Sequence, residues 1–307
     1  MKTTRRTALL LASAAAVAAC DAPSLITRDR KDPFEGGIGG TGIVGTLYGF
    51  GSLLINGLRV ELAAGTQVRT PFGMVGQEGL APGQVLTVAA DRTTDGLTAQ
   101  HVMIDYALVG PLVQGGGSLS VNGIRLVDPS EALGHGTPGA RVAVSGLWTP
   151  EGVRPSRLDP ATSGDDLIAG TFVGGGVGGV ALAGLTETPR NGSYVAALGR
   201  VQHAAFQVRR VHSGRFDRLE RLDLLSVEGY LEPSGAAPGF RISGLGHNFA
   251  RDVRLAAIGS RRALYFGRYT GLFGAERGYL VPDAYAARRE VLTPGLATDF
   301  RGDIIDL

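Results

Sequence analysis

The chain contains the stretch Gly51-Ser-Leu-Leu-Ile-Asn-Gly-Leu-Arg-Val60, which returns nearly unchanged as Gly117-Ser-Leu-Ser-Val-Asn-Gly-Ile-Arg-Leu126. An Asn-Gly pair between alternating apolar residues is a strong β-hairpin signal, because a two-residue type I′ turn needs a positive φ at both central positions. In such a hairpin Val121 and Ile124 face one side of the sheet and Arg125 faces the other. Both stretches therefore predict hairpins with one buried face.

This hairpin belongs to a longer repeat. A glycine followed two residues later by an apolar residue recurs with spacings of 65, 60 and 59 residues, at Gly45, Gly110, Gly170 and Gly229. We predict that each glycine starts a strand that leads into a hairpin. The turns of the third and fourth copies are expected at Ala183-Gly184 and Ser243-Gly244. Glycine is kept because the second turn position needs a positive φ most strictly.

A later strand of each copy alternates apolar residues and, in three copies, contains a glycine: Gly146, Gly199 and Gly267. Copy one has Ala90 at this place. A glycine inside a strand indicates a bulge or a barrel corner. A last strand follows in every copy. A unit of about 60 residues buries little core alone, so it must close into a barrel, pack on its neighbours, or do both.

The expected fold class is all-β, with tandem small antiparallel OB-like β-barrel modules after a lipoprotein signal peptide. The expected modules cover residues 43–106, 107–160, 167–224 and 225–282, and a C-terminal tail covers 283–307. We predict a strand rather than a helix where the chain enters the fourth module, near Leu222 to Leu225. A short helix is expected between Asp283 and Leu292.

The order of these motifs resembles a bacterial family catalogued as domain of unknown function 5666. The shared order is Gly-x-Leu, the Asn-Gly hairpin with its following Arg, a Pro-Gly turn into an alternating strand, and an Asp-Gly turn into the last strand. The resemblance is good over 43–105 and 107–158, and weaker over 167–211 and 225–281. It implies small OB-like barrels in exported proteins. It implies no catalytic residues.

Residues 1–19 have the layout of an export signal, with a basic start, an apolar run and small residues before Cys20. Val17-Ala-Ala-Cys20 resembles the lipobox of bacterial lipoproteins, so Cys20 is the predicted lipid-attachment residue. A plain secretory signal and an uncleaved anchor are the alternatives. Thr4-Arg-Arg-Thr-Ala-Leu-Leu10 is similar to a twin-arginine signal, so the export route stays open. Asp21 points weakly to retention at the inner membrane.

Residues 20–42 combine charges with a glycine-rich run and predict a flexible tether. Removal of residues 1–19 removes three positive charges and no acids, which changes the formal net charge from +2 to −1. The basic pI of the full chain is therefore partly a signal-peptide effect, and nucleic acid is not an expected partner.

The sequence contains none of the common catalytic or metal-binding motifs. There is no Gly-x-Ser-x-Gly elbow, no His-Glu-x-x-His and no metal-ligand spacing among the five histidines. Asp165-Asp166 lacks the spacing of a calcium loop and is expected to be a linker charge pair. We therefore expect no enzyme, no cofactor and no metal.

The third and fourth copies are rich in arginine. The residues that we single out for a possible ligand site are Arg254, Arg261, Arg262, Tyr265 and Arg268. The expected function is a lipid-anchored cell-envelope protein that faces the periplasm and serves as a structural or protein-interaction module. The alternative is a periplasmic binding protein for an oligosaccharide or anionic ligand, since OB-like barrels bind oligosaccharides.

Overall fold

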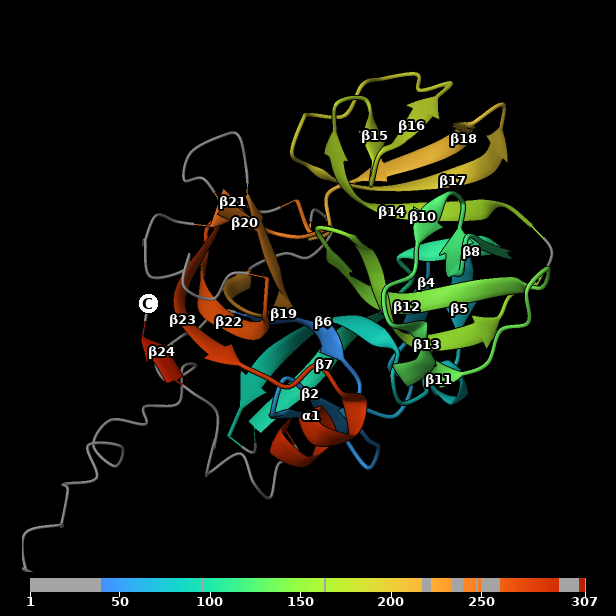
Figure 1. Cartoon of the computed structure of the whole chain (residues 1–307). Coiled ribbons are helices and arrows are strands. Elements are labelled where there is room, and N and C mark those ends of the chain that lie inside the picture. Colours follow the sequence, from blue (N-terminus) through green and yellow to red (C-terminus); the bar gives the residue numbers. More distant parts are fainter. Residues whose placement is uncertain are drawn as a thin grey trace, which may run out of the picture. The chain divides into compact units, whose positions relative to one another are not determined.

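The computed structural model (Figure 1) describes residues 40–94, 96–162, 164–216, 222–233, 240–246, 248–249, 260–292 and 304–306. Within these residues the chain forms strands, one α-helix and two short 3-10 turns, which confirms the all-β prediction. The predicted signal peptide, Cys20 and most of the predicted tether lie outside the described residues. The last part of that tether was wrongly placed, because Gly40–Gly42 already belong to the first strand.

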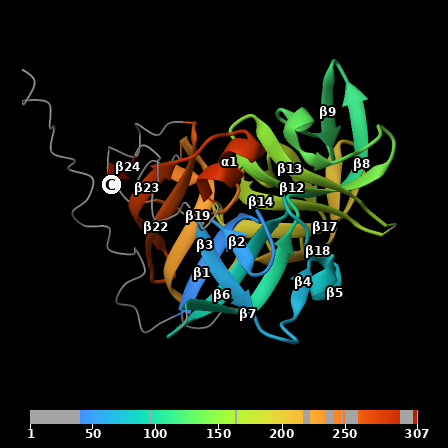
Figure 2. The ribbon, with the colours of Figure 1, turned by 90° about the horizontal axis from the view of Figure 1, so that it is seen from below.

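Module 1 is a five-stranded barrel that closes at the single bridge between Leu47 and Ile55. Its strands are β1 (Gly40–Thr46), β2 (Leu53–Ile55), β3 (Leu58–Leu62), β6 (Val85–Thr93) and β7 (Gly96–Asp105). They follow one another around the barrel as β1-β2-β3-β7-β6 and back to β1, with β3 and β7 parallel. Figure 2 shows these five strands together. An extra hairpin, β4 (Val68–Thr70) and β5 (Gly73–Val75), and a 3-10 turn (Gln77–Gly79) precede β6.

The other modules repeat this element order. Module 2 has β8 (Leu108–Gly115), β9 (Ser118–Val121), β10 (Ile124–Arg125), β12 (Arg141–Thr149) and β13 (Gly152–Pro160). Module 3 has β14 (Asp166–Val173), β15 (Gly176–Val177), β16 (Val180–Ala183), β17 (Tyr194–Gln202) and β18 (Ala205–Ser213). Module 4 has β19 (Leu222–Pro233), β20 (Phe240–Ile242), β21 (Asn248–Phe249), β22 (Arg262–Tyr269) and β23 (Phe273–Leu280). In every module the first strand pairs with the fourth and the fourth with the fifth, both antiparallel.

Four smaller elements complete the described chain. A 3-10 turn (Pro129–Glu131) and β11 (Leu133–Gly134) belong to module 2. The helix α1 (Tyr285–Leu292) follows module 4, which confirms the predicted short helix, and β24 (Ile304–Asp306) pairs with β23. The strand predicted at the entry of module 4 is also confirmed, since β19 begins at Leu222. No helix among the described residues has the length and apolar character needed to cross a membrane.

The predicted hairpin turns are right in modules 1 and 2 and wrong in module 3. Asn56 and Gly57 have φ values of 53° and 74°, as a type I′ turn requires. Asn122 and Gly123 behave alike. In module 3 the two-residue turn is Gly178-Gly179, with φ values of 57° and 82°, and not Ala183-Gly184. Two consecutive glycines supply both positive φ values without a Cβ.

The sequence predicts that the repeated glycine starts the first strand. In the structure this glycine lies inside the strand instead. A Cβ on Gly45 would lie 1.9 Å from Oδ1 of Asn56, and a Cβ on Gly110 would lie 2.4 Å from Oδ1 of Asn122. In module 4 a Cβ on Gly229 would lie 2.4 Å from Ile242. The glycine is repeated because it leaves room for the hairpin that folds over the first strand.

The glycine of the fourth strand marks a bulge, as predicted. The pairing between the fourth and fifth strands shifts register immediately before Gly146, Gly199 and Gly267. A Cβ on Gly199 would lie 1.9 Å from the carbonyl oxygen of Gln207. In module 1 the same shift falls before Ala90. All four modules therefore bend at one equivalent position.

The modules are joined in two pairs through their first strands. β1 of module 1 runs parallel to β19 of module 4, with Val44 opposite Val227. β8 of module 2 runs antiparallel to β14 of module 3, with Val109 opposite Leu167. We call these contacts the β1–β19 seam and the β8–β14 seam. The four modules thus form two continuous sheets rather than isolated barrels.

Candidate functional site

The β1–β19 seam contains a buried carboxylate, Glu228, which is fully excluded from solvent. Its Oε1 accepts hydrogen bonds from Nε of Arg262 at 2.7 Å and from the hydroxyl of Tyr48 at 3.1 Å. Its Oε2 accepts the backbone N–H of Thr46 at 2.8 Å. A second guanidinium, from Arg288, lies 3.6 Å from Oε1. We call these five residues the Glu228 cluster.

The members of this cluster come from four separate parts of the chain, since Thr46 and Tyr48 lie together at the end of β1. Glu228 lies on β19 just beyond the residue that pairs with β1, and Arg262 begins the neighbouring strand β22. Nη2 of Arg262 also donates to Oγ1 of Thr46 at 3.1 Å, which ties module 4 to module 1. The helix α1 adds Arg288, whose Nε donates to the hydroxyl of Tyr48 at 2.9 Å, and Tyr285, whose ring stacks on Tyr48.

The electrostatics of the Glu228 cluster favour the ionised carboxylate. Burial alone would raise the pKa of Glu228, but the Arg262 and Arg288 guanidinium groups and the hydrogen bonds lower it to about 2. Burial raises the pKa of the Tyr48 hydroxyl above its ordinary value, so this group stays protonated and serves as a donor. The arrangement is a buried structural ion network, because every oxygen of the carboxylate already has a protein partner.

A second buried ion pair links module 1 with the end of module 3. Nη1 of Arg215 lies 2.5 Å from Oδ2 of Asp105 and donates to Oγ1 of Thr87 at 2.9 Å. The guanidinium also lies 4.6 Å from the centre of the Tyr194 ring. Burial raises the pKa of Asp105, and Arg215 opposes that shift. This carboxylate is therefore held ionised less firmly than Glu228.

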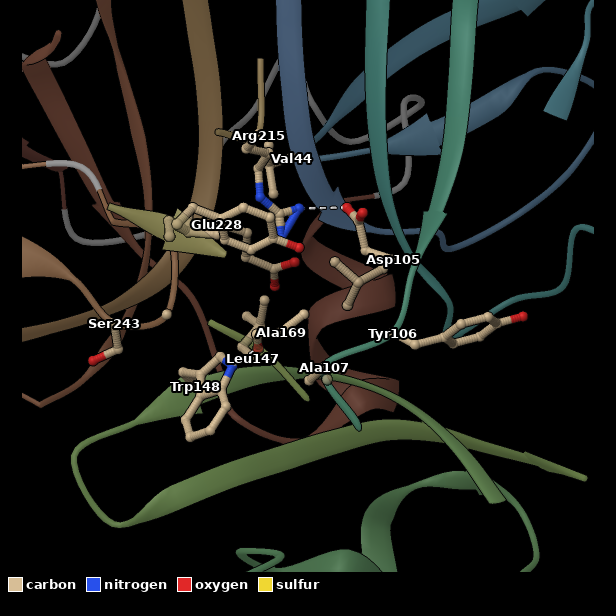
Figure 3. A pocket seen from close by; sticks show the side chains of 15 residues that line it. Val44, Asp105, Tyr106, Ala107, Leu147, Trp148, Ala169, Arg215, Glu228 and Ser243 are labelled. Carbon is tan, nitrogen blue, oxygen red and sulfur yellow. Dashed lines mark hydrogen bonds and ion pairs between the residues drawn. The ribbon is translucent and has the colours of Figure 1, made fainter. Parts of the chain in front are cut away.

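Figure 3 shows the cavity beside this pair, where residues of all four modules meet. Arg215 and Asp105 lie on one side of it, and Trp148 and Ala169 on another. Its volume is about 20 Å³, which is room for about one water molecule. Nε of Arg215 has no hydrogen-bond partner among the described residues and can donate to such a water. The cavity does not accommodate an organic ligand.

The side chain of Trp148 in module 2 contacts modules 3 and 4. Its Nε1 donates to the carbonyl oxygen of Ala169 at 2.8 Å. The indole ring occupies space that two glycines leave open: a Cβ would lie 2.6 Å from the ring at Gly178 and 2.0 Å from it at Gly244. This contact explains why the hairpin of module 3 has glycine where modules 1 and 2 have asparagine.

The asparagines of the hairpin turns are also seam residues. Nδ2 of Asn56 donates to the carbonyl oxygen of Val44 and to Oγ of Ser226, each at 3.0 Å. Nδ2 of Asn122 donates to the carbonyl oxygen of Val109 at 2.9 Å and to that of Leu167 at 3.0 Å. Each side chain thus bonds its own first strand and the first strand of the paired module. The sequence pattern predicts only a role in turn geometry for these two asparagines.

Their Oδ1 atoms have no hydrogen-bond donor within the described protein. Each faces the glycine of the first strand at the position that a Cβ would take. This geometry fits a weak Cα–H···O contact from Gly45 and from Gly110. The repeated glycine and the repeated asparagine are therefore one unit, and both are present in the two modules whose hairpins meet a seam.

The residues predicted for ligand binding do not gather on one surface. Arg262 belongs to the Glu228 cluster, and Tyr265 is buried in the core of module 4, so neither is offered to solvent. Arg261 is exposed, and the side chain of Arg268 is 80% exposed and lies 3.4 Å from Glu276. Arg254 lies outside the described residues. The sequence alone did not indicate that Arg262 on β22 forms a buried ion pair with Glu228.

The predicted linker pair Asp165-Asp166 is engaged in ion pairs. Asp165 lies 2.7 Å from Nη1 of Arg209, and Asp166 lies 2.5 Å from Nη1 of Arg141. No group of three potential metal ligands occurs in the part of the chain that the structure describes.

Comparison with protein-family models found no match, and comparisons with curated proteins and with solved structures found no significant match. The resemblance to domain of unknown function 5666 therefore stays a prediction from the motifs of the chain.

Proposed function

We propose that the protein is a lipid-anchored cell-envelope scaffold that presents a fixed outer surface to a protein partner and performs no catalysis. The observation that carries this proposal is the joining of the four barrels. First strands pair across both seams. Side-chain hydrogen bonds or ion pairs to a neighbouring module are made by Asn56, Asn122, Arg215, Arg262 and Trp148. Two of the residues that the sequence offered for ligand chemistry, Arg262 and Tyr265, are buried inside the protein. A rigid frame of this kind suits the docking of a partner.

The cellular location in this proposal rests on the sequence. Export and acylation of Cys20 would place the body at the surface of an envelope membrane, facing the periplasm. The tether that follows Cys20 would give the body room to reach a partner.

The binding of an oligosaccharide or another anionic ligand is the weaker candidate. Its remaining support is the exposed pair Arg261 and Arg268, because Arg262 and Tyr265 are buried.

Chemical crosslinking and affinity purification of the full chain from detergent-solubilised membranes test the scaffold proposal. We expect one stoichiometric protein partner and retention of the chain in the membrane fraction. The variant Cys20→Ser should be processed differently and leave that fraction. Absence of a stoichiometric partner contradicts the scaffold role, and unchanged fractionation of Cys20→Ser contradicts the anchor. Saturable glycan binding that is lost in the double variant Arg261→Ala/Arg268→Ala would favour the ligand-binding candidate instead.

A further inference from the structure

Three of the four modules carry an additional strand on the outer edge of their fifth strand. In module 1, β4 lies beside Val102 and Met103 of β7. In module 2, β11 lies beside Arg157 and Leu158 of β13. In module 4, the C-terminal strand β24 lies beside Arg277–Tyr279 of β23. The same part of the barrel edge is thus built to accept an extended chain.

Module 3 has no such strand among the residues that the structure describes. The corresponding edge of β18 includes Val211 and Ser213, and no strand among the described residues pairs with their outward-facing backbone groups. The cause is the length of the preceding connection. Residues 184–193 connect β16 to β17, only 10 residues, whereas 22 residues (63–84) and 15 residues (126–140) fill that place in modules 1 and 2. Ten residues that also make the turn into β17 leave none for an edge strand.

The ladder pattern shows which backbone groups this edge presents. The N–H of Gly214 donates to the carbonyl oxygen of Tyr194 at 2.9 Å, so Gly214 faces β17. Hydrogen-bonded and non-hydrogen-bonded pairs alternate along an antiparallel ladder. Ser213 and Val211, which pair with Val195 and Ala197, therefore direct their N–H and C=O groups away from β17 and toward the open edge.

The side chains along the edge are basic. Arg209 and Arg210 are exposed, and Arg200 is exposed on the neighbouring strand β17. Arg209 already holds a carboxylate, that of Asp165, at 2.7 Å. Positive charge disfavours pairing of this edge with a second copy of itself and favours an acidic strand.

We propose that the open edge of β18 binds an extended acidic peptide segment of a partner protein by β-strand addition. Main-chain hydrogen bonds to Val211 and Ser213 supply affinity, and carboxylates opposite Arg209 and Arg210 supply selectivity. This inference rests on the proposed scaffold function and names its docking surface and the chemistry of its partner.

Fluorescence anisotropy with the full chain in detergent and a labelled octapeptide of alternating Val and Glu tests the inference. We expect saturable binding, and none for the matched peptide of alternating Val and Lys. Ser213→Pro removes an outward N–H without touching the β17 ladder and should weaken binding at least tenfold. Arg209→Glu/Arg210→Glu should do the same. The matched control Arg125→Glu, an exposed arginine of module 2, should bind like the natural chain.

Absence of Val/Glu binding, equal binding of the Val/Lys peptide, or full binding by Ser213→Pro overturns the inference. If a β18 variant fails to fold by circular dichroism, a Val/Glu peptide N-methylated at every second residue replaces it. That peptide should lose binding to the natural chain, and retained binding contradicts strand addition. Capture of the crosslinked partner by folded Ser213→Pro at natural yield would overturn the docking site while leaving the scaffold function standing.

Discussion

The β8–β14 seam and the β1–β19 seam join equivalent strands by different means. Across β8 and β14, modules 2 and 3 share one apolar core that contains both Leu108 and Ile168. Across β1 and β19, Val44 and Ala89 of module 1 pack into the core of module 4, the rest of the module 1 core is separate from it, and the Glu228 cluster lies between the strands. Apolar packing is indifferent to pH, whereas a buried carboxylate depends on its ionisation. The comparison predicts that acid weakens the β1–β19 seam more than the β8–β14 seam.

The largest effect should come from removing the charge of the β1–β19 seam. Glu228→Gln keeps the shape of the side chain but leaves Arg262 and Arg288 buried without their carboxylate. Breaking a buried ion pair by removing one partner costs about 3–5 kcal/mol. The free energy of unfolding from urea titration at pH 7 measures this loss.

The matched control is Glu276→Gln, which removes the carboxylate of the exposed pair with Arg268. Exposed ion pairs contribute about 0–1 kcal/mol. Equal losses for Glu228→Gln and Glu276→Gln would show that the Glu228 cluster does not stabilise the seam.

A comparable loss should follow from a cavity in the other seam. Ile168→Ala shortens a fully buried side chain of β14 in the core that modules 2 and 3 share. Large-to-small core changes of this kind cost about 2–5 kcal/mol. The loss, measured by urea unfolding, should be the same at pH 7 and pH 4. If the loss of unfolding free energy caused by Ile168→Ala were smaller at pH 4 than at pH 7, the two seams would not differ in their sensitivity to acid.

Acid should weaken the β1–β19 seam in the natural protein. The pKa of Glu228 is lowered from 4.5 to about 2 in the fold, so its contribution is complete above pH 4.5 and is lost as the pH falls toward 2. At 1.36 kcal/mol per pKa unit, about 2 kcal/mol of this contribution is gone by pH 3. The difference in unfolding free energy between the natural chain and Glu228→Gln should therefore shrink between pH 5 and pH 3. A constant difference would contradict the assigned ionisation.

The smallest effect concerns the hairpin asparagine. Asn122→Gly preserves the positive φ of the turn and removes only the hydrogen bonds to Val109 and Leu167. We expect a loss of about 1–2 kcal/mol, since two buried carbonyl groups lose a donor. Asn191→Gly, at an exposed asparagine, serves as the control and should cost less. An unchanged free energy of unfolding in Asn122→Gly would mean that this asparagine serves turn geometry alone.

Local patterns were sufficient to predict the barrel units. The positive φ at Gly57 and Gly123 and the bulges at Gly146 and Gly199 follow from steric rules that act within a few residues. The position of Gly45 inside its strand was missed, because its cause is the side chain of Asn56 folding back over it.

The seams could not be predicted from the sequence, because their partners are far apart along the chain. Asn56 and Ser226 are separated by 170 residues, and nothing near either residue specifies the other. One signal was available: Glu228 is the single charge in the otherwise uncharged run from Leu224 to Leu231. A carboxylate inside a buried strand requires a cationic partner. Arg262, on the strand that pairs with β19, supplies it.

Amide hydrogen exchange on the natural chain at pH 7 and pH 3, corrected for the intrinsic effect of pH, tests the difference between the seams most directly. We predict that the amides of β1 and β19 lose protection at pH 3, while those of β8 and β14 keep theirs. Equal loss of protection in both seams, or earlier loss at β8 and β14, would contradict the account.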